Sequence, residues 1–156
     1  MGGRVVLLCG LPGSGKTTLA KQLEADLGAV RFCPDEWMTA LGVDLWEEDD
    51  FRFRLEQLQW GLAQELLGHG LTVVIEWGVW AKEERDAVRE RARELGAAVE
   101  LRHLDLPLDE LWDRIEKRNA EPMWHDRPMS RVHLDYWATI IEPPTGDELS
   151  LYDDPA

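Results

Sequence analysis

The sequence predicts an α/β fold in which a parallel sheet of about five strands carries helices on both faces. Two observations support this prediction. Short apolar runs rich in Val, Leu and Ile alternate with longer amphipathic segments, and this repeated strand–helix–strand order is typical of parallel sheets. The chain has 156 residues, a length that suits one domain with one hydrophobic core. We therefore expect a single domain over residues 1–156.

Four apolar runs are predicted to form strands. They cover residues 4–9, 29–33, 71–76 and 98–104, and they are rich in Val, Leu and Ile. We expect a fifth strand near the C-terminus, where residues 139–142 and 150–152 are the candidates, both with a weak pattern.

The segments between these runs have the spacing of amphipathic helices. Leu19, Leu23 and Leu27 recur every four residues in the first, which covers residues 16–27. Similar patterns predict helices over residues 49–68, 82–95 and 108–119. The periodicity stops in EPMWHDRPMS, residues 121–130, which predicts a loop followed by a short helix over residues 130–140. We expect residues 107–130 to form a helical lid over the ligand edge of the sheet.

The charge of the chain limits its partners. It has 31 Asp and Glu residues against 17 Lys and Arg residues, a net charge of −14. Such a surface repels a nucleic-acid backbone, so we expect a nucleic-acid partner to be unlikely and a small molecule to be the partner. No run of the sequence resembles a signal peptide or a membrane span. Two cysteines in short apolar runs indicate buried free thiols, and we expect a cytoplasmic protein.

A phosphate-binding motif lies between the first strand and the first helix. The stretch GLPGSGKT, residues 10–17, matches G-x-x-x-x-G-K-[ST] in the strand-then-helix context that this motif requires. Its backbone N–H groups would bind phosphate oxygens, Lys16 would reach the β- and γ-phosphates, and the Thr17 hydroxyl would bind Mg²⁺. The predicted nucleotide-binding residues are Gly10, Leu11, Pro12, Gly13, Ser14, Gly15, Lys16, Thr17 and Thr18. The motif predicts a three-layer P-loop NTPase fold with ATP and Mg²⁺ as cofactors.

Two acidic residues follow strands at the edge where ligands bind in such folds. Asp35 follows the second strand in FCPDEWM, where a carboxylate could accept the proton of an acceptor hydroxyl. An alternative role for Asp35 is the N-cap of a helix over residues 36–41, and the two roles are compatible. Glu76 ends the third strand in VVIEWG, where it would hold magnesium-bound water or the acceptor hydroxyl, or serve only the structure.

Two further groups of residues are candidates for the site. Arg114 and Arg118 lie four residues apart on one helical face, where their guanidinium groups could bind the transferring phosphoryl group or form a solvated charged face. Tryptophans that follow the strands could form an acceptor pocket together with Asp44, Glu47 and Glu48, although ordinary packing would explain them as well. These tryptophans are Trp37, Trp46, Trp77 and Trp80.

The chain resembles the P-loop kinases of the zeta-toxin, chloramphenicol phosphotransferase and polynucleotide kinase group, whose members are also known as AAA-family ATPases. GLPGSGKT, VVIEWG, LDELWDRIEKRN and the tail EPPTGDEL carry the resemblance over nearly the whole chain. The resemblance implies that Asp35 is the general base and that Arg114 and Arg118 contact phosphates. Relatives often have a basic residue shortly after the base. Here Trp37 and Met38 occupy that place, which disfavours an anionic or polynucleotide acceptor.

The combined prediction is a kinase that moves the γ-phosphate of ATP to a hydroxyl of a small molecule. Asp35, Lys16, Arg118 and Arg114 are its predicted catalytic residues, and we expect a monomer or a homodimer. Two alternatives stay open, a polynucleotide or nucleoside 5′-hydroxyl kinase and a nucleotide-binding switch that hydrolyses ATP slowly.

Overall fold

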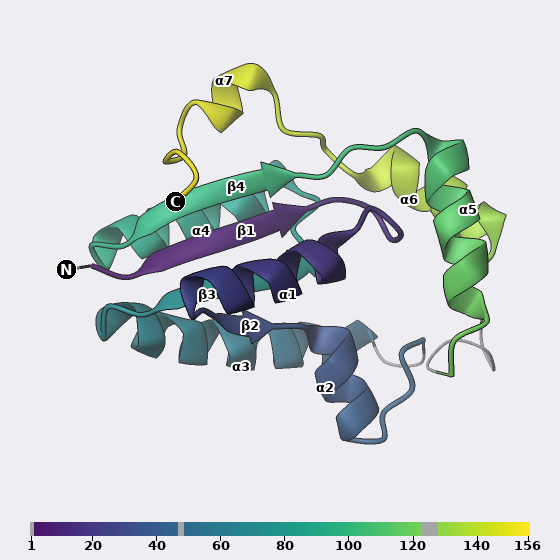
Figure 1. Ribbon diagram of the computed structural model, residues 1–156, viewed down its shortest axis with the longest axis horizontal. Coiled ribbons are helices and arrows are strands. Elements are labelled where there is room, and N and C mark those ends of the chain that lie inside the picture. Colours follow the sequence, from purple (N-terminus) through teal and green to yellow (C-terminus); the bar gives the residue numbers. More distant parts are fainter. Residues whose placement is uncertain (1, 47–48, 123–127) are drawn as a thin grey trace.

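The computed structural model describes residues 2–46, 49–122 and 128–156, and its centre is a parallel sheet (Figure 1). The strands are β1 (Arg4–Cys9), β2 (Val30–Phe32), β3 (Thr72–Gly78) and β4 (Ala98–His103). They lie in the order β2-β3-β1-β4, and all three pairings are parallel. The α/β fold with a parallel sheet is therefore confirmed, and each predicted strand is present with ends shifted by at most two residues.

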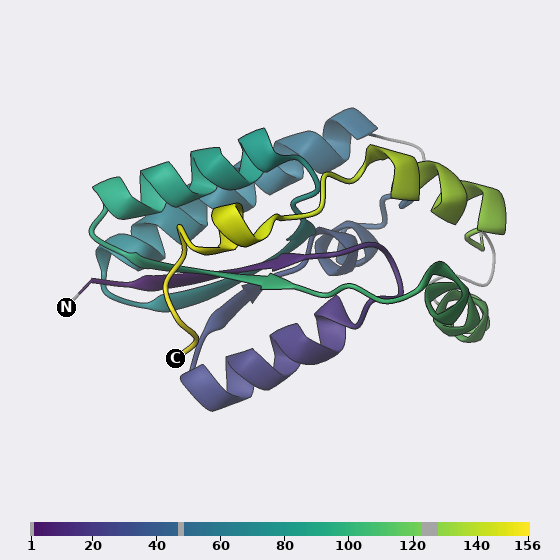
Figure 2. The same cartoon turned by 90° about the horizontal axis from the view of Figure 1, so that it is seen from above.

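Helices cover both faces of the sheet (Figure 2). One face carries α1 (Lys16–Leu27), and the other carries α3 (Asp49–Gly68) and α4 (Lys82–Glu94). A short α2 (Pro34–Ala40) follows β2, and α5 (Leu108–Asn119) and α6 (Arg131–Ile140) lie together beyond the carboxyl ends of the strands. The chain ends with α7 (Gly146–Leu149) on the α4 side. None of the described helices is both long and apolar enough to cross a membrane.

The central strand shows why the fold has three layers. Val5 and Leu7 of β1 pack into a core with α3 and α4, whereas Val6 and Leu8 pack into a second core with α1. All four side chains have no exposed surface. Successive side chains of a strand point to opposite faces, so a continuous apolar run needs cover on both sides.

The described residues form no fifth strand, so this expectation is wrong. Residues 139 and 140 end α6, and residues 150–152 form a turn after α7. Pro143 and Pro144 lie between these two places, and proline cannot donate to a strand ladder. The tail nevertheless meets the free edge of β4, because the Asp153 backbone N–H donates to the Val99 carbonyl at 2.8 Å and the Asp153 carboxylate accepts from the Val99 N–H at 2.7 Å.

The N-cap role considered for Asp35 is also wrong. Cys33 is the N-cap of α2 and Pro34 is its first residue, so Asp35 lies inside the first turn. Proline favours this first position because its φ is fixed at a helical value and its missing N–H would have no partner there. The predicted lid corresponds in part to α5, whereas residues 123–127 of the predicted loop lie outside the described residues.

Candidate active site

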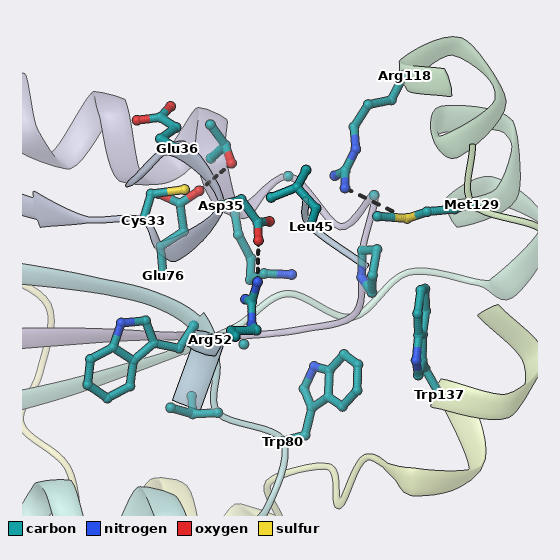
Figure 3. Close-up of a pocket in the computed structure, with 18 of the residues that line it drawn as sticks. Cys33, Asp35, Glu36, Leu45, Arg52, Glu76, Trp80, Arg118, Met129 and Trp137 are labelled. Carbon is teal, nitrogen blue, oxygen red and sulfur yellow. Dashed lines mark hydrogen bonds and ion pairs between the residues drawn. The ribbon is translucent and has the colours of Figure 1, made fainter. Parts of the chain in front are cut away.

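A large cavity lies at the carboxyl ends of the strands, between the loop after β1 and the helices α2, α3, α5 and α6 (Figure 3). Its volume is about 900 Å³, enough for a nucleotide and a second small molecule. The polar and charged residues that line it are Lys16, Thr17, Thr18, Lys21, Asp35, Glu36, Arg52, Glu56, Glu76, Glu84, Arg114, Lys117, Arg118 and Glu121. The nucleotide loop, both predicted acids and both predicted arginines therefore share one cavity.

The loop after β1 needs its glycines for two physical reasons. Gly13 and Gly15 have φ angles of 82° and 95°, a region that other residues rarely adopt. A Cβ on Gly13 would also lie 2.9 Å from the Leu111 carbonyl oxygen and 3.1 Å from the Ile115 side chain. Helix α5 thus packs directly on the loop, and this contact places the arginines of α5 above it.

Lys16 is held by the loop itself. Its Nζ donates to the carbonyl oxygens of Gly10 at 2.8 Å and Leu11 at 2.9 Å. Burial lowers the pKa of Lys16 to about 8, and the positive charge of Arg118 adds to this effect. The negative charges of Asp35 and Glu76 oppose this lowering. Phosphate oxygens would add negative charge beside the ammonium group, so the site suits a polyphosphate.

Thr17 and Glu76 form an oxygen pair beside the loop. The Thr17 hydroxyl donates to Glu76 Oε1, and Arg31 donates to Glu76 Oε2 at 2.9 Å. No group of three or more His, Cys, Asp or Glu side chains in the described ranges is arranged to hold a metal ion. Mg²⁺ usually takes only one or two protein ligands and completes its shell with water and phosphate oxygens. The Thr17 hydroxyl and the Glu76 carboxylate fit that requirement.

Asp35 meets a cation that the sequence reasoning missed. Arg52 Nη1 of α3 pairs with Asp35 Oδ1 (Figure 3). Arg52 Nε also donates to Glu56 Oε1 at 3.1 Å. A basic residue thus reaches the base from α3, although the positions directly after Asp35 are Trp37 and Met38. The direction of the predicted helices could have indicated this arginine. The first turns of helices that follow parallel strands lie at the carboxyl edge of the sheet, so charges early in α3 and α4 belong to the site.

The two predicted arginines of α5 differ in their surroundings. Arg118 is half-buried, its guanidinium lies 3.8 Å from the Met129 sulfur, and burial lowers its pKa (Figure 3). Arg114 is 47% exposed and donates to Glu110 at 3.3 Å. A Cβ on Gly15 would still lie 3.5 Å from Arg114 Nη1, so both arginines reach the phosphate end of the cavity.

The tryptophans divide into two groups. Trp46, Trp77 and Trp80 line the cavity, as does Trp137 of α6, which the sequence reasoning missed. Trp37 is not among the described lining residues and packs on Phe32 instead. Asp44 accepts from the Trp46 backbone N–H at 2.8 Å, and the predicted Glu47 and Glu48 lie outside the described residues.

The loop that carries Trp80 is held by hydrogen bonds from a buried arginine. Val79 has a φ of 39°, which a β-branched residue rarely adopts. The fully buried Arg85 donates to the carbonyl oxygens of Val79 at 2.9 Å and Trp80 at 3.0 Å, and it pairs with Glu148 of α7 at 2.6 Å. The side chain of the same residue makes a further contact, because Trp80 Nε1 donates to the Gly10 carbonyl at 2.9 Å. The tail, the aromatic wall and the phosphate loop are thus joined by one set of hydrogen bonds.

The model of the family named AAA domain (AAA_33) matches residues 5–144, which is most of the chain. The protein belongs to this AAA domain family. The match includes the loop after β1, Asp35, Glu76 and both arginines of α5. No curated protein matches the sequence.

Three solved structures show how the family fold relates to known proteins. A chain of the Pnkp1/Rnl/Hen1 RNA repair complex has a TM-score of 0.72 at 18% identity, covering 96% of this chain and 44% of that one. A gluconokinase from Sinorhizobium meliloti has a TM-score of 0.62 at 21% identity, covering 93% and 78%. The Mycobacterium tuberculosis APS kinase CysC, solved with AMPPNP and APS, has a TM-score of 0.62 at 21% identity, covering 99% and 84%.

These likenesses show the fold. This AAA domain protein spans less than half of the RNA repair chain and about four fifths of the two kinases. It has a P-loop kinase-like fold, as the sequence motifs predicted, and the resemblance to the P-loop kinase group is confirmed.

Proposed function

We propose that this protein is an ATP-dependent kinase that transfers the γ-phosphate to a hydroxyl of a small molecule. One observation carries the proposal. Lys16 of α1, Asp35 of α2 and Arg118 of α5 line the same cavity. Lys16 would bind the phosphates there, and Asp35 would accept the proton. A nucleotide switch needs the phosphate loop and one carboxylate near its magnesium ion, a role that Glu76 beside Thr17 would fill, but it does not need a second carboxylate such as Asp35.

The proposed reaction is an in-line displacement. The acceptor hydroxyl oxygen forms a bond to the γ-phosphorus, the bond from that phosphorus to the β–γ bridging oxygen breaks, and ADP leaves. Asp35 takes the hydroxyl proton, and Arg52 holds its carboxylate in place. Lys16 and Arg118 stabilise the charge on the transferring group.

The cofactors follow from the same residues. ATP would lie with its phosphates along residues 10–18. Mg²⁺, when bound, supplies charge neutralisation at the phosphates, and the Thr17 hydroxyl with Glu76 nearby would hold it. Trp46, Trp77 and Trp80 would line the acceptor side of the cavity. The described contacts give Trp37 a packing role instead.

A transfer screen tests this proposal. Purified protein is incubated with Mg²⁺, γ-labelled ATP and one candidate acceptor at a time. The acceptors are sugars, nucleosides, antibiotics and 5′-hydroxyl oligonucleotides, and labelled products are separated from free phosphate. We expect a labelled small molecule with the wild type and none with Lys16→Ala. Labelled oligonucleotide alone would instead establish the end-kinase alternative, which the likeness to the RNA repair chain favours. Release of free phosphate that no acceptor changes would contradict a kinase.

A further inference from the structure

The charges of the cavity are divided between its two ends. The cations Lys16, Lys21, Arg114, Lys117 and Arg118 come from α1 and α5, the two helices that touch the phosphate loop. The other end is formed by Asp35, Glu56 and Glu84 of α2, α3 and α4 with the guanidinium of Arg52, although the charge of Asp35 also acts on Lys16 and Arg118. Three further carboxylates of the described residues line the cavity, those of Glu36, Glu76 and Glu121. A nucleotide would satisfy the first end but not the second.

One arginine pairs with two of the three carboxylates at this acidic end. Arg52 uses Nη1 for Asp35 and Nε for Glu56, so its two sides are already engaged. Burial raises the pKa of Glu56 to about 7, and the negative charges of Glu84 and Asp35 oppose its ionisation while Arg52 favours it. Burial likewise raises the pKa of Glu84, and the positive charge of Arg85, which is itself paired with Glu148, opposes this change. The acidic end therefore disfavours further ionised carboxylates, and a cation bound there would favour the ionised forms of Glu56 and Glu84.

The aromatic residues of this end present ring surface and have no free donor. Trp77 Nε1 donates to Gln59 at 2.8 Å and Trp80 Nε1 donates to Gly10 at 2.9 Å. Phe53 of α3 also lines the cavity and is 60% exposed. Indole and phenyl faces attract cations and repel anions, because their π-electrons are negative. The rings and the carboxylates are independent features that favour the same ligand charge.

We infer that the acceptor is an amino alcohol, whose hydroxyl lies at Asp35 and whose protonated amine lies near Glu56 and Glu84, against the indole wall formed by Trp77 and Trp80. This inference rests on the proposed kinase function and specifies its substrate class. An anionic acceptor would meet these carboxylates, and Arg52 and Arg85, the cations described beside them, are already paired. A neutral polyol would bring no positive charge to favour ionisation of Glu56 and Glu84.

Matched acceptor pairs test the inference. Small amino alcohols, amino sugars and aminocyclitols are each compared with their N-acetyl forms, which keep the hydroxyls and lose the positive charge. Transfer from γ-labelled ATP is measured as kcat/KM, and binding of the same pairs is measured by calorimetry with Mg²⁺ and a non-hydrolysable ATP analogue. We expect the best amine to exceed its N-acetyl form by about tenfold or more in both measurements.

Variants of α4 identify the residue that reads the amine. Glu84→Gln should remove most of the preference for the amine, because kcat/KM for the amine should fall by a much larger factor than kcat/KM for its N-acetyl form. Glu83→Gln is the matched control, because Glu83 is exposed, lies on the same helix and is not among the described residues that line this cavity. The preference should also grow from pH 6 to pH 8, as Glu56 loses its proton.

The two measurements separate the possible failures. Transfer to hydroxyl compounds with no advantage for the amines would overturn the amino-alcohol inference and leave the kinase function intact. Selective binding of amines without any transfer would overturn the kinase function and leave a cation site. An amine preference that survives in Glu84→Gln would contradict the assigned position of the amine.

Discussion

The phosphate end and the acceptor end of the cavity are built in different ways. Residues 10–18 form the phosphate end as one continuous segment, the turn after β1 and the first residues of α1, with Lys16 held by carbonyls of the same loop. The acceptor end collects side chains from α2, α3, α4 and α6. The difference teaches that a local motif specifies the phosphate donor, whereas long-range packing specifies the acceptor. Substitutions at the two ends should therefore have separable kinetic effects.

The largest expected effect is at the phosphate end. Lys16→Ala should reduce turnover to below about one thousandth of the wild type, because the cation that would contact the β- and γ-phosphates is lost. Steady-state kinetics and calorimetry with Mg-ATP check this. Lys21→Ala is the control, since Lys21 lines the same cavity but lies outside the motif. Equal losses in the two variants would mean that general charge, and not the motif, matters.

The next effect separates the two arginines of α5. Arg118→Ala should lower kcat by about 10²-fold with a smaller change in ATP affinity, because its charge acts mainly on the transferring group. Arg114→Ala should cost less, since Arg114 is 47% exposed and already paired with Glu110. The two values of kcat, measured at saturating ATP, decide the matter. Identical losses would contradict the difference in their surroundings.

A smaller effect tests the link between the two ends. Trp80→Phe keeps an aromatic ring and removes the N–H that donates to Gly10. When Lys16 turns toward phosphates, Trp80 becomes the donor that keeps this carbonyl satisfied, so Mg-ATP affinity should fall by about 3–10-fold. Trp60→Phe is the control, because Trp60 packs beside the core cluster under α3. Unchanged affinity in Trp80→Phe would show that the two ends are independent.

The smallest expected effect is the uptake of protons when Mg-ATP binds. The pKa of Lys16 is about 8 in the free protein, and phosphate contact should raise it. Binding of Mg-ATP at pH 8 should therefore take up about half a proton, and affinity should weaken as pH rises above 8. Calorimetry in two buffers with different ionisation enthalpies measures this uptake. Buffer-independent heats at pH 8 would show that Lys16 is already fully charged.

The sequence was sufficient for the elements that depend on local pattern. The leucine spacing of residues 16–27 and the phosphate motif gave the bounds of α1 and the position of the loop without error. The fifth strand failed because prolines interrupt the segment, and because one backbone and one side-chain hydrogen bond between Asp153 and Val99 replace a ladder at the edge of β4. No short-range pattern encodes such a contact.

The acceptor end was less accessible to sequence reasoning. Asp35 and the tryptophans after the strands were expected at the ligand edge, since strand ends meet there. Arg52 and Glu84 were missed, because each reads as an ordinary solvated charge on its helix. Only the placement of α3 and α4 against the sheet brings Arg52 to Asp35, which lies 17 positions earlier. Trp37 was expected in the acceptor pocket, but its ring packs against Phe32 instead.

The most direct test of the proposed kinase is the substitution Asp35→Asn. The acceptor found in the transfer screen is used with saturating Mg-ATP, and the single-turnover rate of transfer is measured together with ATP affinity. Asparagine keeps the shape of the side chain but cannot take the proton, so the rate should fall by about 10²–10⁴-fold while ATP affinity stays near that of the wild type. Transfer at the wild-type rate would contradict the assignment of Asp35 as the base, and Glu76 would then be the carboxylate to test.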